Sequence, residues 1–414
     1  MKRLKKPTIS LCMIVKNEED FLSQCLQSVK EVVDEIVLVD TGSSDATLES
    51  AHSFKAKVFQ HEWKEDFSDA RNVSLKHATS DWILFLDADE ILDQKSAQML
   101  LEILQRTEHF GFFFCIYSVK ANGFVSGRHY TVRLFRNQEG VRFVGKIHEQ
   151  ILPMGKLAYS GMSIYHFGYD LDPETMKRKK ERNAHILKQI LAKSGEDPIL
   201  RYHLANTHLL LGEYEQAIEH ATKGMELTKE FKEKNYLYLA TLQVLTEVYC
   251  QMREWDKAEA WCLEALSIRD DFIDALYSLA RIYMIKNDCR KALLIYHRFL
   301  EKKRLIDCEP ERGFFFRCLN SWGRESDVHN DLGGIFYEGG NLDRAIEEVR
   351  RAIALQPHDA RAYYNLGSAL ARKAQFKEAR ASFKKALEIE PAYPEAEEGL
   401  KMLKGSLETS PKLE

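Results

Sequence analysis

The apolar residues of the first 170 positions fall in short runs separated by turn-forming residues. Between several of these runs lie segments with helical spacing, such as 19–33 and 46–54. This alternation predicts a parallel α/β sheet, and the strands from about Gly111 onward, which no helix separates, predict an antiparallel addition. The strand-like runs are TISLCMIV from Thr8, EIVLVD from Glu35, KVFQ from Lys57, WILFLD from Trp82, FFFCIYSV from Phe112 and TVRLF from Thr131.

The second half of the chain is helical in pattern and self-similar. Six positions recur with an offset of 34 residues, the length of a tetratricopeptide repeat. Small residues in this order mark close helix contacts, aromatic residues fill the space between helix pairs, and the proline ends the second helix. Three weaker copies precede these two, so we expect about five repeats in an all-α solenoid. The aligned positions are Gly333, Phe336, Ala345, Val349, Ala352 and Pro357 against Gly367, Leu370, Ala379, Phe383, Ala386 and Pro391.

Together these patterns predict that the chain consists of four consecutive segments. A charged stretch, KRKKERN at 177–183, is interpreted as a solvated helix face rather than a nucleic-acid patch. Three consecutive phenylalanines at 314–316 would pack on a neighbouring repeat or on the α/β domain, or form an acceptor surface. The expected parts are an α/β domain at 1–171 with its core at 8–170, a helical linker at 172–197, repeats at 198–403 with an insertion near 307–325, and a disordered tail at 404–414.

Composition excludes some classes of protein. The formal net charge of −4 gives no reason to expect nucleic acid as a partner. Eight cysteines without a CxxC pair indicate reduced thiols and a cytoplasmic location. The basic start before an apolar run imitates a signal peptide, but that run is brief and lacks a cleavage site. We expect no transmembrane segment, because no run approaches the roughly 20 apolar residues that span a bilayer.

Carboxylates follow two of the expected strands. Asp40 ends EIVLVD, at the sheet edge where open α/β folds bind ligands, whereas Asp45 in the next turn is also a plausible helix cap. Asp87 and Asp89 follow WILFL with one alanine between them. Two like charges at a strand end are costly unless a cation compensates them. The pair therefore indicates Mg²⁺ or Mn²⁺ shared with a substrate diphosphate.

Residues 8 to about 170 resemble a family 2 glycosyltransferase domain of GT-A fold, a Rossmann-like mixed sheet. TISLCMIVKNEEDFLSQCLQSV resembles the family's first strand and helix, VDTGSSDAT its nucleotide-binding turn, and FLDADE its DxD motif. EWKEDFSDARN, GKIHEQ and YHFGY match further. With the repeats, the chain is similar to the subgroup that includes peptide S-glycosyltransferases of glycosylated bacteriocins.

The resemblance implies roles for the matching residues. Asp40 would bind the base or ribose of a uridine-type nucleotide, supported by Asp45. Asp87 would face the ribose or the metal, Asp89 would ligate the metal, and His166 in YHFGY would be a further ligand of the metal or diphosphate. Without the family match, a lone histidine is more often structural. Glu18, in the motif after the first strand, is assigned to the nucleotide-sugar site.

The acceptor side needs a general base, since an acceptor hydroxyl or thiol must lose a proton. Glu149 is the expected base and His148 the reserve, in a position where the family usually carries paired acidic residues. Alternatively, the pair joins a hydrogen-bond network under the acceptor site. Arg71 and Asn72 are expected to contact phosphate or sugar hydroxyls.

The sequence leaves two interpretations open for each of three further residues. Trp63 would stack on a sugar or pack internally, since large aromatic side chains usually fill cores. Arg133 and Arg136 would face the diphosphate or form surface salt bridges.

The expected activity is inverting transfer of a hexose from a nucleoside-diphosphate sugar, expected to be UDP-linked, to a peptide, protein or glycan. The concave surface of the repeats suits an extended peptide, a protein partner or a second copy of the chain. One alternative is a non-catalytic tetratricopeptide adaptor with a degenerate transferase domain. Another is a transferase for cell-surface polysaccharide or lipid-linked sugar. A nucleotidyltransferase is disfavoured because no glycine- and arginine-rich phosphate loop follows the first strand.

Overall fold

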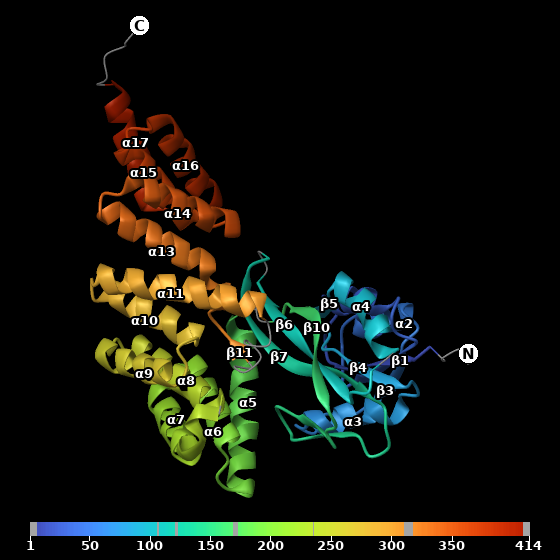
Figure 1. Ribbon diagram of the computed structural model, residues 1–414. Coiled ribbons are helices and arrows are strands. Elements are labelled where there is room, and N and C mark those ends of the chain that lie inside the picture. Colours follow the sequence, from blue (N-terminus) through green and yellow to red (C-terminus); the bar gives the residue numbers. More distant parts are fainter. Residues whose placement is uncertain are drawn as a thin grey trace. The chain divides into compact units, whose positions relative to one another are not determined.

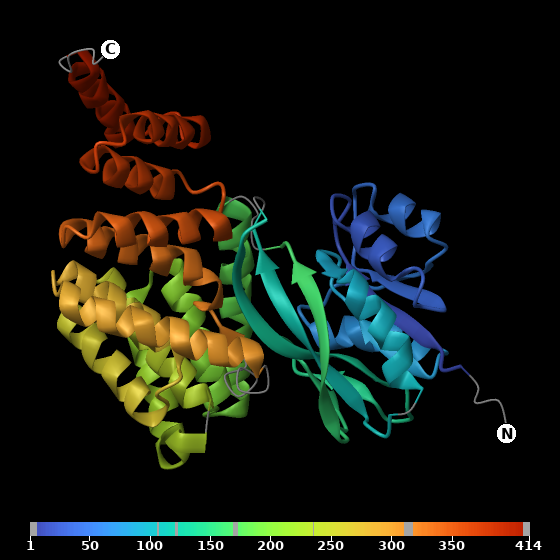
Figure 2. The ribbon, with the colours of Figure 1, turned by 45° about the horizontal axis from the view of Figure 1, so that its top comes forward.

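The computed structural model describes residues 6–105, 107–120, 123–168, 173–234, 236–309 and 318–408 (Figures 1 and 2). The chain divides into two compact units, and each is considered by itself. Unit 1 consists of Met1–Met252 and Glu309–Leu319, and unit 2 of Arg253–Cys308 and Asn320–Glu414. None of the described helices is both long enough and apolar enough to cross a membrane.

A nine-stranded mixed sheet organises unit 1. Its order is β3-β2-β1-β4-β7-β6-β10-β5, and β11 pairs with β7 beside this path. β1 lies parallel to β2 and β4, whereas β7 is antiparallel to β4 and β6. β10 runs parallel to β6, so the later part of the sheet is mixed rather than purely antiparallel as the sequence predicted. The strands are β1 Ile9–Val15, β2 Glu35–Asp40, β3 Lys57–Gln60, β4 Trp82–Phe85, β5 Glu90–Leu92, β6 Gly111–Val119, β7 Val125–Arg136, β8 Arg142–Val144, β9 Gln150–Leu152, β10 Leu157–His166 and β11 Cys318–Leu319.

Helices cover both faces of this sheet. The largest apolar cluster joins one face to α1 (Leu22–Val29), α2 (Thr47–Ser53) and α4 (Gln94–Leu104). A second cluster, on the other face, includes Leu75 of α3 (Phe67–His77) and the separate ribbon of β8 and β9. Burying both faces explains why the central strands β2 and β4 are apolar at nearly every position.

Five helical segments follow the sheet within unit 1. The expected linker is a 22-residue helix, α5, and it packs on α6 through Ile186, Leu187 and Leu204. The same cluster includes Ile147 from the loop between β8 and β9, so the helices are anchored to the sheet domain. The segments are α5 Pro173–Ser194, α6 Pro198–Leu211, α7 Tyr214–Thr228, η1 Lys229–Lys234 and α8 Tyr236–Gln251.

Unit 2 is helical apart from short connections. Its glycines show the repeat packing: a Cβ on Gly367 would lie 2.6 Å from the ring of Phe383, and one on Gly333 would lie 2.4 Å from Val349. These are the small and bulky positions that the 34-residue offset singled out. The helices are α9 Trp255–Ile268, α10 Ile273–Ile285, α11 Cys289–Cys308, η2 Trp322–Arg324, α13 Glu325–Glu338, α14 Leu342–Leu355, α15 Ala360–Arg372, α16 Phe376–Ile389 and α17 Pro394–Glu408.

The insertion and the tail differ in part from the sequence analysis. Residues 310–317, with the three phenylalanines, lie outside the described residues. After them, the carboxylate of Asp274 accepts hydrogen bonds from the backbone N–H groups of Asn320 and Ser321 at 3.0 and 2.7 Å. Helix α17 continues to Glu408, so residues 404–408 of the expected tail are helical, and 409–414 lie outside the described residues. A mixed sheet domain followed by an all-α array confirms the predicted fold class.

Candidate functional site

The carboxyl ends of β1, β2 and β4 meet at one edge of the sheet, and the loops after β1 and β2 are tied together there. The side-chain oxygen of Asn17 accepts a hydrogen bond from the backbone N–H of Ser44 at 2.8 Å, and the backbone N–H of Asn17 donates to Ser43 Oγ at 3.0 Å. The N–H of Glu18 donates to Thr47 Oγ1 at 2.7 Å. These bonds build a defined polar rim where ligands bind in open α/β sheets.

Asp40 and Asp45 both shape this rim. Asp40 is buried, and its carboxylate accepts the N–H groups of Ser43 at 3.0 Å and Gly42 at 3.3 Å. Asp45, two residues before the first residue of α2, accepts the backbone N–H of Thr47 at 3.0 Å and its hydroxyl at 2.5 Å. Desolvation alone would raise the pKa of Asp45, but the hydrogen bonds from Thr47 hold it below its usual value. Both carboxylates therefore order the turn, and their contact with a nucleotide stays a prediction.

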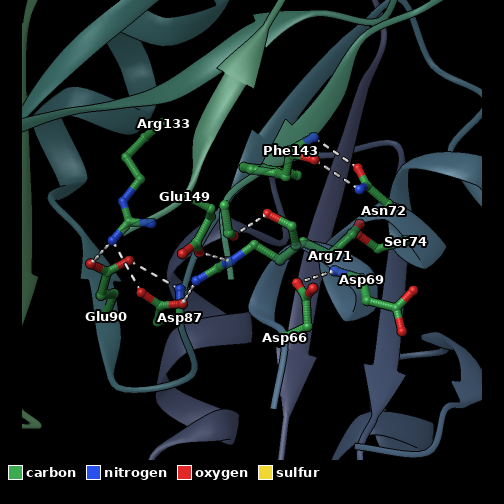
Figure 3. A network of polar contacts seen from close by, with 12 residues as sticks. Asp66, Asp69, Arg71, Asn72, Ser74, Asp87, Glu90, Arg133, Phe143 and Glu149 are labelled. Carbon is green, nitrogen blue, oxygen red and sulfur yellow. Dashed lines mark hydrogen bonds and ion pairs between the residues drawn. The ribbon is translucent and has the colours of Figure 1, made fainter. Parts of the chain in front are cut away.

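Asp87, the first carboxylate of the DxD, is held by two arginines (Figure 3). Arg71 Nη2 lies 2.9 Å from one of its oxygens, and Arg133 Nη2 lies 3.1 Å from the other. Both guanidinium groups also lie over the ring of Phe85, at 4.1 and 4.2 Å from its centroid. Desolvation would raise the pKa of Asp87, but the two positive charges outweigh it and hold that pKa well below its usual value.

Glu90 is a third carboxylate at this point, which the sequence analysis did not single out. It is 1% exposed, pairs with Arg133 and accepts the N–H of Asp87 at 3.0 Å. Burial raises the pKa of Glu90 to about 7, although Arg133 opposes the shift. The acidic residue directly after the DxD in FLDADE was the available signal.

Asp89 faces a different set of neighbours. The pairing of β5 with β10 places His166 opposite Glu90, and His166 Nε2 lies 3.4 Å from Asp89 Oδ1. Gly168 packs so closely that an added Cβ would lie 1.7 Å from Asp89 Oδ2. Burial raises the pKa of Asp89 and lowers that of His166, while each charge opposes the shift of the other. The structure thus brings together the two residues that the sequence assigned to the metal.

Glu18 and two residues that sequence reasoning missed interact electrostatically with the residues of the DxD. Burial, together with the charge of Asp89, raises the pKa of Glu18 to about 7. Lys179, on α5, opposes both the Glu18 and the Asp89 shifts. His129, on β7, lies where burial and then the charge of Arg133 lower its pKa to about 4. No motif singled out either residue, and they lie on elements remote in sequence from the DxD, α5 and β7.

Glu149 lies on the other side of Arg71 (Figure 3). Its side chain is 11% exposed and forms an ion pair with Arg71 Nε, so one guanidinium links Glu149 to Asp87. His148, next to it, has a left-handed backbone with φ of 53° and stacks its ring on that of His203 from α6. The expected base Glu149 is therefore linked to the DxD through Arg71, whereas its reserve His148 contacts α6.

Asn72 and Trp63 have structural contacts. Asn72 Nδ2 donates to the carbonyl of Phe143 at 2.9 Å, and its Oδ1 accepts the N–H of the same residue at 2.8 Å. Asn72 thereby ties α3 to β8, and its contact with the donor stays a prediction. Trp63 packs edge-on against Phe67, with ring centroids 4.9 Å apart, as the packing interpretation expected.

Arg133 and Arg136, which both belong to β7, differ in position. Arg133 is buried within the site rather than in a surface salt bridge. Arg136 pairs in register with Trp82, the first residue of β4, and its guanidinium lies over that ring at 4.6 Å. The DxD follows the last residue of β4, so Arg136 is at the opposite end of the strand. The expectation that it faces the diphosphate was wrong.

The side chains at the DxD supply part of the ligand set that a divalent ion requires. Among the described residues, no three side chains from His, Cys, Asp and Glu come together as a metal site. Asp89 and His166 nevertheless provide an oxygen and a nitrogen donor within 3.4 Å of one another. Magnesium-type sites often use one or two protein ligands and take the others from substrate phosphates and water. The pair fits an ion that is shared with a bound diphosphate.

Comparison with known proteins agrees with this geometry. Residues 10–165 match the family described as Glycosyl transferase family 2, and residues 198–271 and 330–396 match tetratricopeptide repeats. The SPbeta prophage-derived glycosyltransferase SunS of Bacillus subtilis is 30% identical over 250 residues, or 58% of each chain. A TPR repeat-containing protein of Synechococcus elongatus is 34% identical over 229 residues, or 53% of this chain and 56% of that one.

A third relative is also named as a glycosyltransferase. The lipopolysaccharide core biosynthesis glycosyltransferase LpsC of Rhizobium meliloti is 24% identical over 212 residues, 47% of this chain and 76% of that one. The chain spans less than two thirds of the first two relatives. The matched ranges confirm the resemblance seen in the motifs: residues 10–165 form a family 2 glycosyltransferase domain, and tetratricopeptide repeats follow it.

Proposed function

We propose that the protein transfers a hexose, with inversion, from a UDP-linked sugar to an acceptor, using Mn²⁺ or Mg²⁺ at the leaving diphosphate. The observation that carries this proposal is the juxtaposition of Asp89, His166 and Gly168 at the carboxyl edge of the sheet. Two metal donors beside a glycine that permits close approach suit a diphosphate with its ion. Inversion and the uridine base follow from the family resemblance.

The donor occupies the polar rim in this proposal. The turn ordered by Asp40 and Asp45 receives the nucleoside. Glu18 is tied to Thr47 beside that turn by its backbone N–H, and the charge of Asp89 contributes to raising its pKa. Asp89 and His166 would hold the metal ion, and the chemistry that it would supply there is Lewis-acid stabilisation of the leaving diphosphate. Asp87 is kept charged and oriented by its two arginines, so it provides a fixed acceptor for ribose hydroxyls.

The acceptor approaches from the side of Glu149. Glu149 takes the proton of the acceptor hydroxyl or thiol, the acceptor atom bonds to the anomeric carbon, and the bond from that carbon to the diphosphate oxygen breaks. Arg71 orients the carboxylate through its ion pair. His148 is the reserve base, next along the same loop.

The acceptor itself is proposed to be a peptide or protein. Tetratricopeptide arrays form extended concave surfaces, and such surfaces suit a polypeptide. The similarity to LpsC, whose name gives lipopolysaccharide core biosynthesis, supports a glycan acceptor as the second candidate.

The test is donor hydrolysis and thermal shift of the full chain with a panel of nucleotide sugars, with and without Mn²⁺. The proposal predicts that one donor, UDP-linked, raises the melting temperature and releases nucleoside diphosphate only when the ion is present. If no donor is bound or cleaved, the transferase proposal is wrong and the adaptor interpretation replaces it.

A further inference from the structure

Phe85, the last residue of β4, lies against the charged groups of the candidate site. Its side chain is buried, and its ring packs edge-on against that of Phe143, with the centroids 5.3 Å apart. Both rings belong to the apolar cluster on the α3 side of the sheet. The position of the Phe85 ring is therefore fixed by the core of the domain.

Two guanidinium groups share this ring. The guanidinium carbons of Arg71 and Arg133 lie 4.1 and 4.2 Å from its centroid. A cation within about 6 Å of the centroid is attracted by the ring electrons. Arg71 belongs to α3 and Arg133 to β7, so Phe85 is a common support for two arginines that come from different elements.

Strand pairing explains how Arg133 reaches the ring. The last pair in register between β4 and β7 is Leu84 with Leu134, so Phe85 and Arg133 come next on the two strands. The register of β6 with β7 shifts at the same point and leaves Arg133 without a counterpart on β6. Such irregularities re-aim a side chain, and they are common beside active sites.

Each of the two guanidinium groups has one nitrogen without a hydrogen-bond acceptor. Nη1 of Arg71 and Nε of Arg133 are buried, and no acceptor reaches them among the residues that the structure describes. A buried donor without an acceptor is costly. The face of an aromatic ring is a weak acceptor for N–H groups, so the ring of Phe85 compensates in part for the missing hydrogen bonds. An aliphatic side chain has no such face.

The same two arginines connect the acids of the site (Figure 3). Arg71 joins Glu149 to Asp87, and Arg133 joins Asp87 to Glu90. The proposed base and the first carboxylate of the DxD therefore depend on one guanidinium group for their orientation. Small displacements of catalytic groups cost rate, so whatever fixes this guanidinium affects the reaction.

We propose that Phe85 is a positioning residue, whose ring holds Arg71 and Arg133 in the places from which they orient Glu149 and Asp87. This inference rests on the proposed function. It gives the phenylalanine two residues before the DxD a role beyond filling the core.

The experiment compares Phe85→Leu, Phe85→Tyr and the control Phe110→Leu in the full chain. Phe110 is as buried as Phe85 and belongs to the same apolar cluster, but its ring stacks on that of Phe135. Cleavage of the donor with Mn²⁺ is measured as kcat and KM, together with the melting temperature. Phe85→Leu is expected to lower kcat about tenfold and to leave KM for the donor nearly unchanged. Phe85→Tyr should keep most of kcat, and Phe110→Leu all of it, while both leucine variants melt at similarly lowered temperatures.

A double substitution tests whether Phe85 acts through an arginine. Lysine lacks the planar fork of arginine, so Arg71→Lys already disturbs the link between Glu149 and Asp87. Phe85→Leu should therefore lower kcat by a smaller factor in the Arg71→Lys background than in the unmutated protein.

Two results overturn the inference. One is a kcat in Phe85→Leu equal to that in Phe110→Leu. The other is a reduction of kcat by Phe85→Leu that is the same with and without Arg71→Lys. If the unmutated protein cleaves its donor while either result holds, this inference alone fails. If the unmutated protein cleaves no donor, the proposed function fails, and this inference fails with it.

Discussion

The rings of His148 and His203 stack with their centroids 3.5 Å apart and their planes 10° from parallel. His148 precedes Glu149 in the loop between β8 and β9, whereas His203 belongs to α6, the first helix of the matched repeats. Ile147 in the same loop is buried against α5 and α6. The segment that carries the proposed base is therefore supported by helices that follow the transferase domain.

The stack predicts that His203 affects catalysis through the position of Glu149. His203→Ala should lower kcat for transfer about tenfold while leaving KM for the donor nearly unchanged, because small displacements of a catalytic group cost rate. His203→Phe, which keeps an aromatic ring, should restore most of kcat. Steady-state kinetics of these variants, with the exposed Leu210→Ala on the same helix as control, measures the effect. Unchanged kcat in His203→Ala would show that the stack is not needed.

The substitution Arg71→Met is expected to lower the free energy of unfolding strongly. Arg71 is 8% exposed and linked to both Asp87 and Glu149, so Arg71→Met leaves Glu149 without its ion-pair partner and Asp87 with Arg133 alone. Removing one partner from a buried pair costs about 3 kcal/mol or more of unfolding free energy. The surface pair of Lys64 with Asp69 at 3.4 Å gives the contrast, since Lys64→Met should cost less than about 1 kcal/mol. Denaturant unfolding of both variants is the measurement, and equal losses would contradict this account.

Glu18 predicts a pH dependence of stability. Its pKa is raised to about 7 in the folded protein, so between pH 4.5 and 7 the folded state holds a proton that the unfolded state has lost. Its contribution to stability is complete below the unfolded pKa and is lost as pH rises through about 7. Glu18→Gln, which mimics the protonated form, should match the unmutated protein at pH 5 and exceed its melting temperature at pH 8. Parallel pH profiles would contradict the shift.

Gly168 predicts a loss of activity without loss of the fold. An added Cβ would lie 1.7 Å from Asp89 Oδ2, so Gly168→Ala must displace that carboxylate. Metal-dependent donor cleavage should fall at least a hundredfold. Gly334 in α13 has no atom within 4 Å of an added Cβ, so Gly334→Ala should keep full activity and gain about 0.5–1 kcal/mol in stability. If Gly168→Ala cleaves donor at the original rate, Asp89 is not required where the structure places it.

Local sequence predicted much of the fold. The strands before Asp40 and Asp87 form where the apolar runs occur, and the 34-residue offset identified glycines that pack against Phe383 and Val349. These strands and repeats could be predicted because they depend on residues close together in the sequence or on a fixed repeat length. The family resemblance of YHFGY likewise allowed His166 to be assigned to the site from the sequence, and His166 lies 3.4 Å from Asp89.

Other features depend on tertiary pairing. The sequence offers two arginines in TVRLFRN, but only the register of β7 with β4 shows that Arg133 reaches Asp87 and Arg136 does not. The sequence shows that Asp40 is a carboxylate at a strand end. It does not show that the backbone N–H groups of Gly42 and Ser43 donate hydrogen bonds to that carboxylate.

The central claim is that Asp89 and His166 support metal-dependent cleavage of a nucleotide sugar. The most direct measurement is release of nucleoside diphosphate by the unmutated protein, Asp89→Asn and His166→Ala over a range of Mn²⁺ concentrations. We predict Mn²⁺-dependent release by the unmutated protein, none by Asp89→Asn, and a raised Mn²⁺ requirement in His166→Ala, with all three melting as folded proteins. Undiminished release by Asp89→Asn would contradict the account.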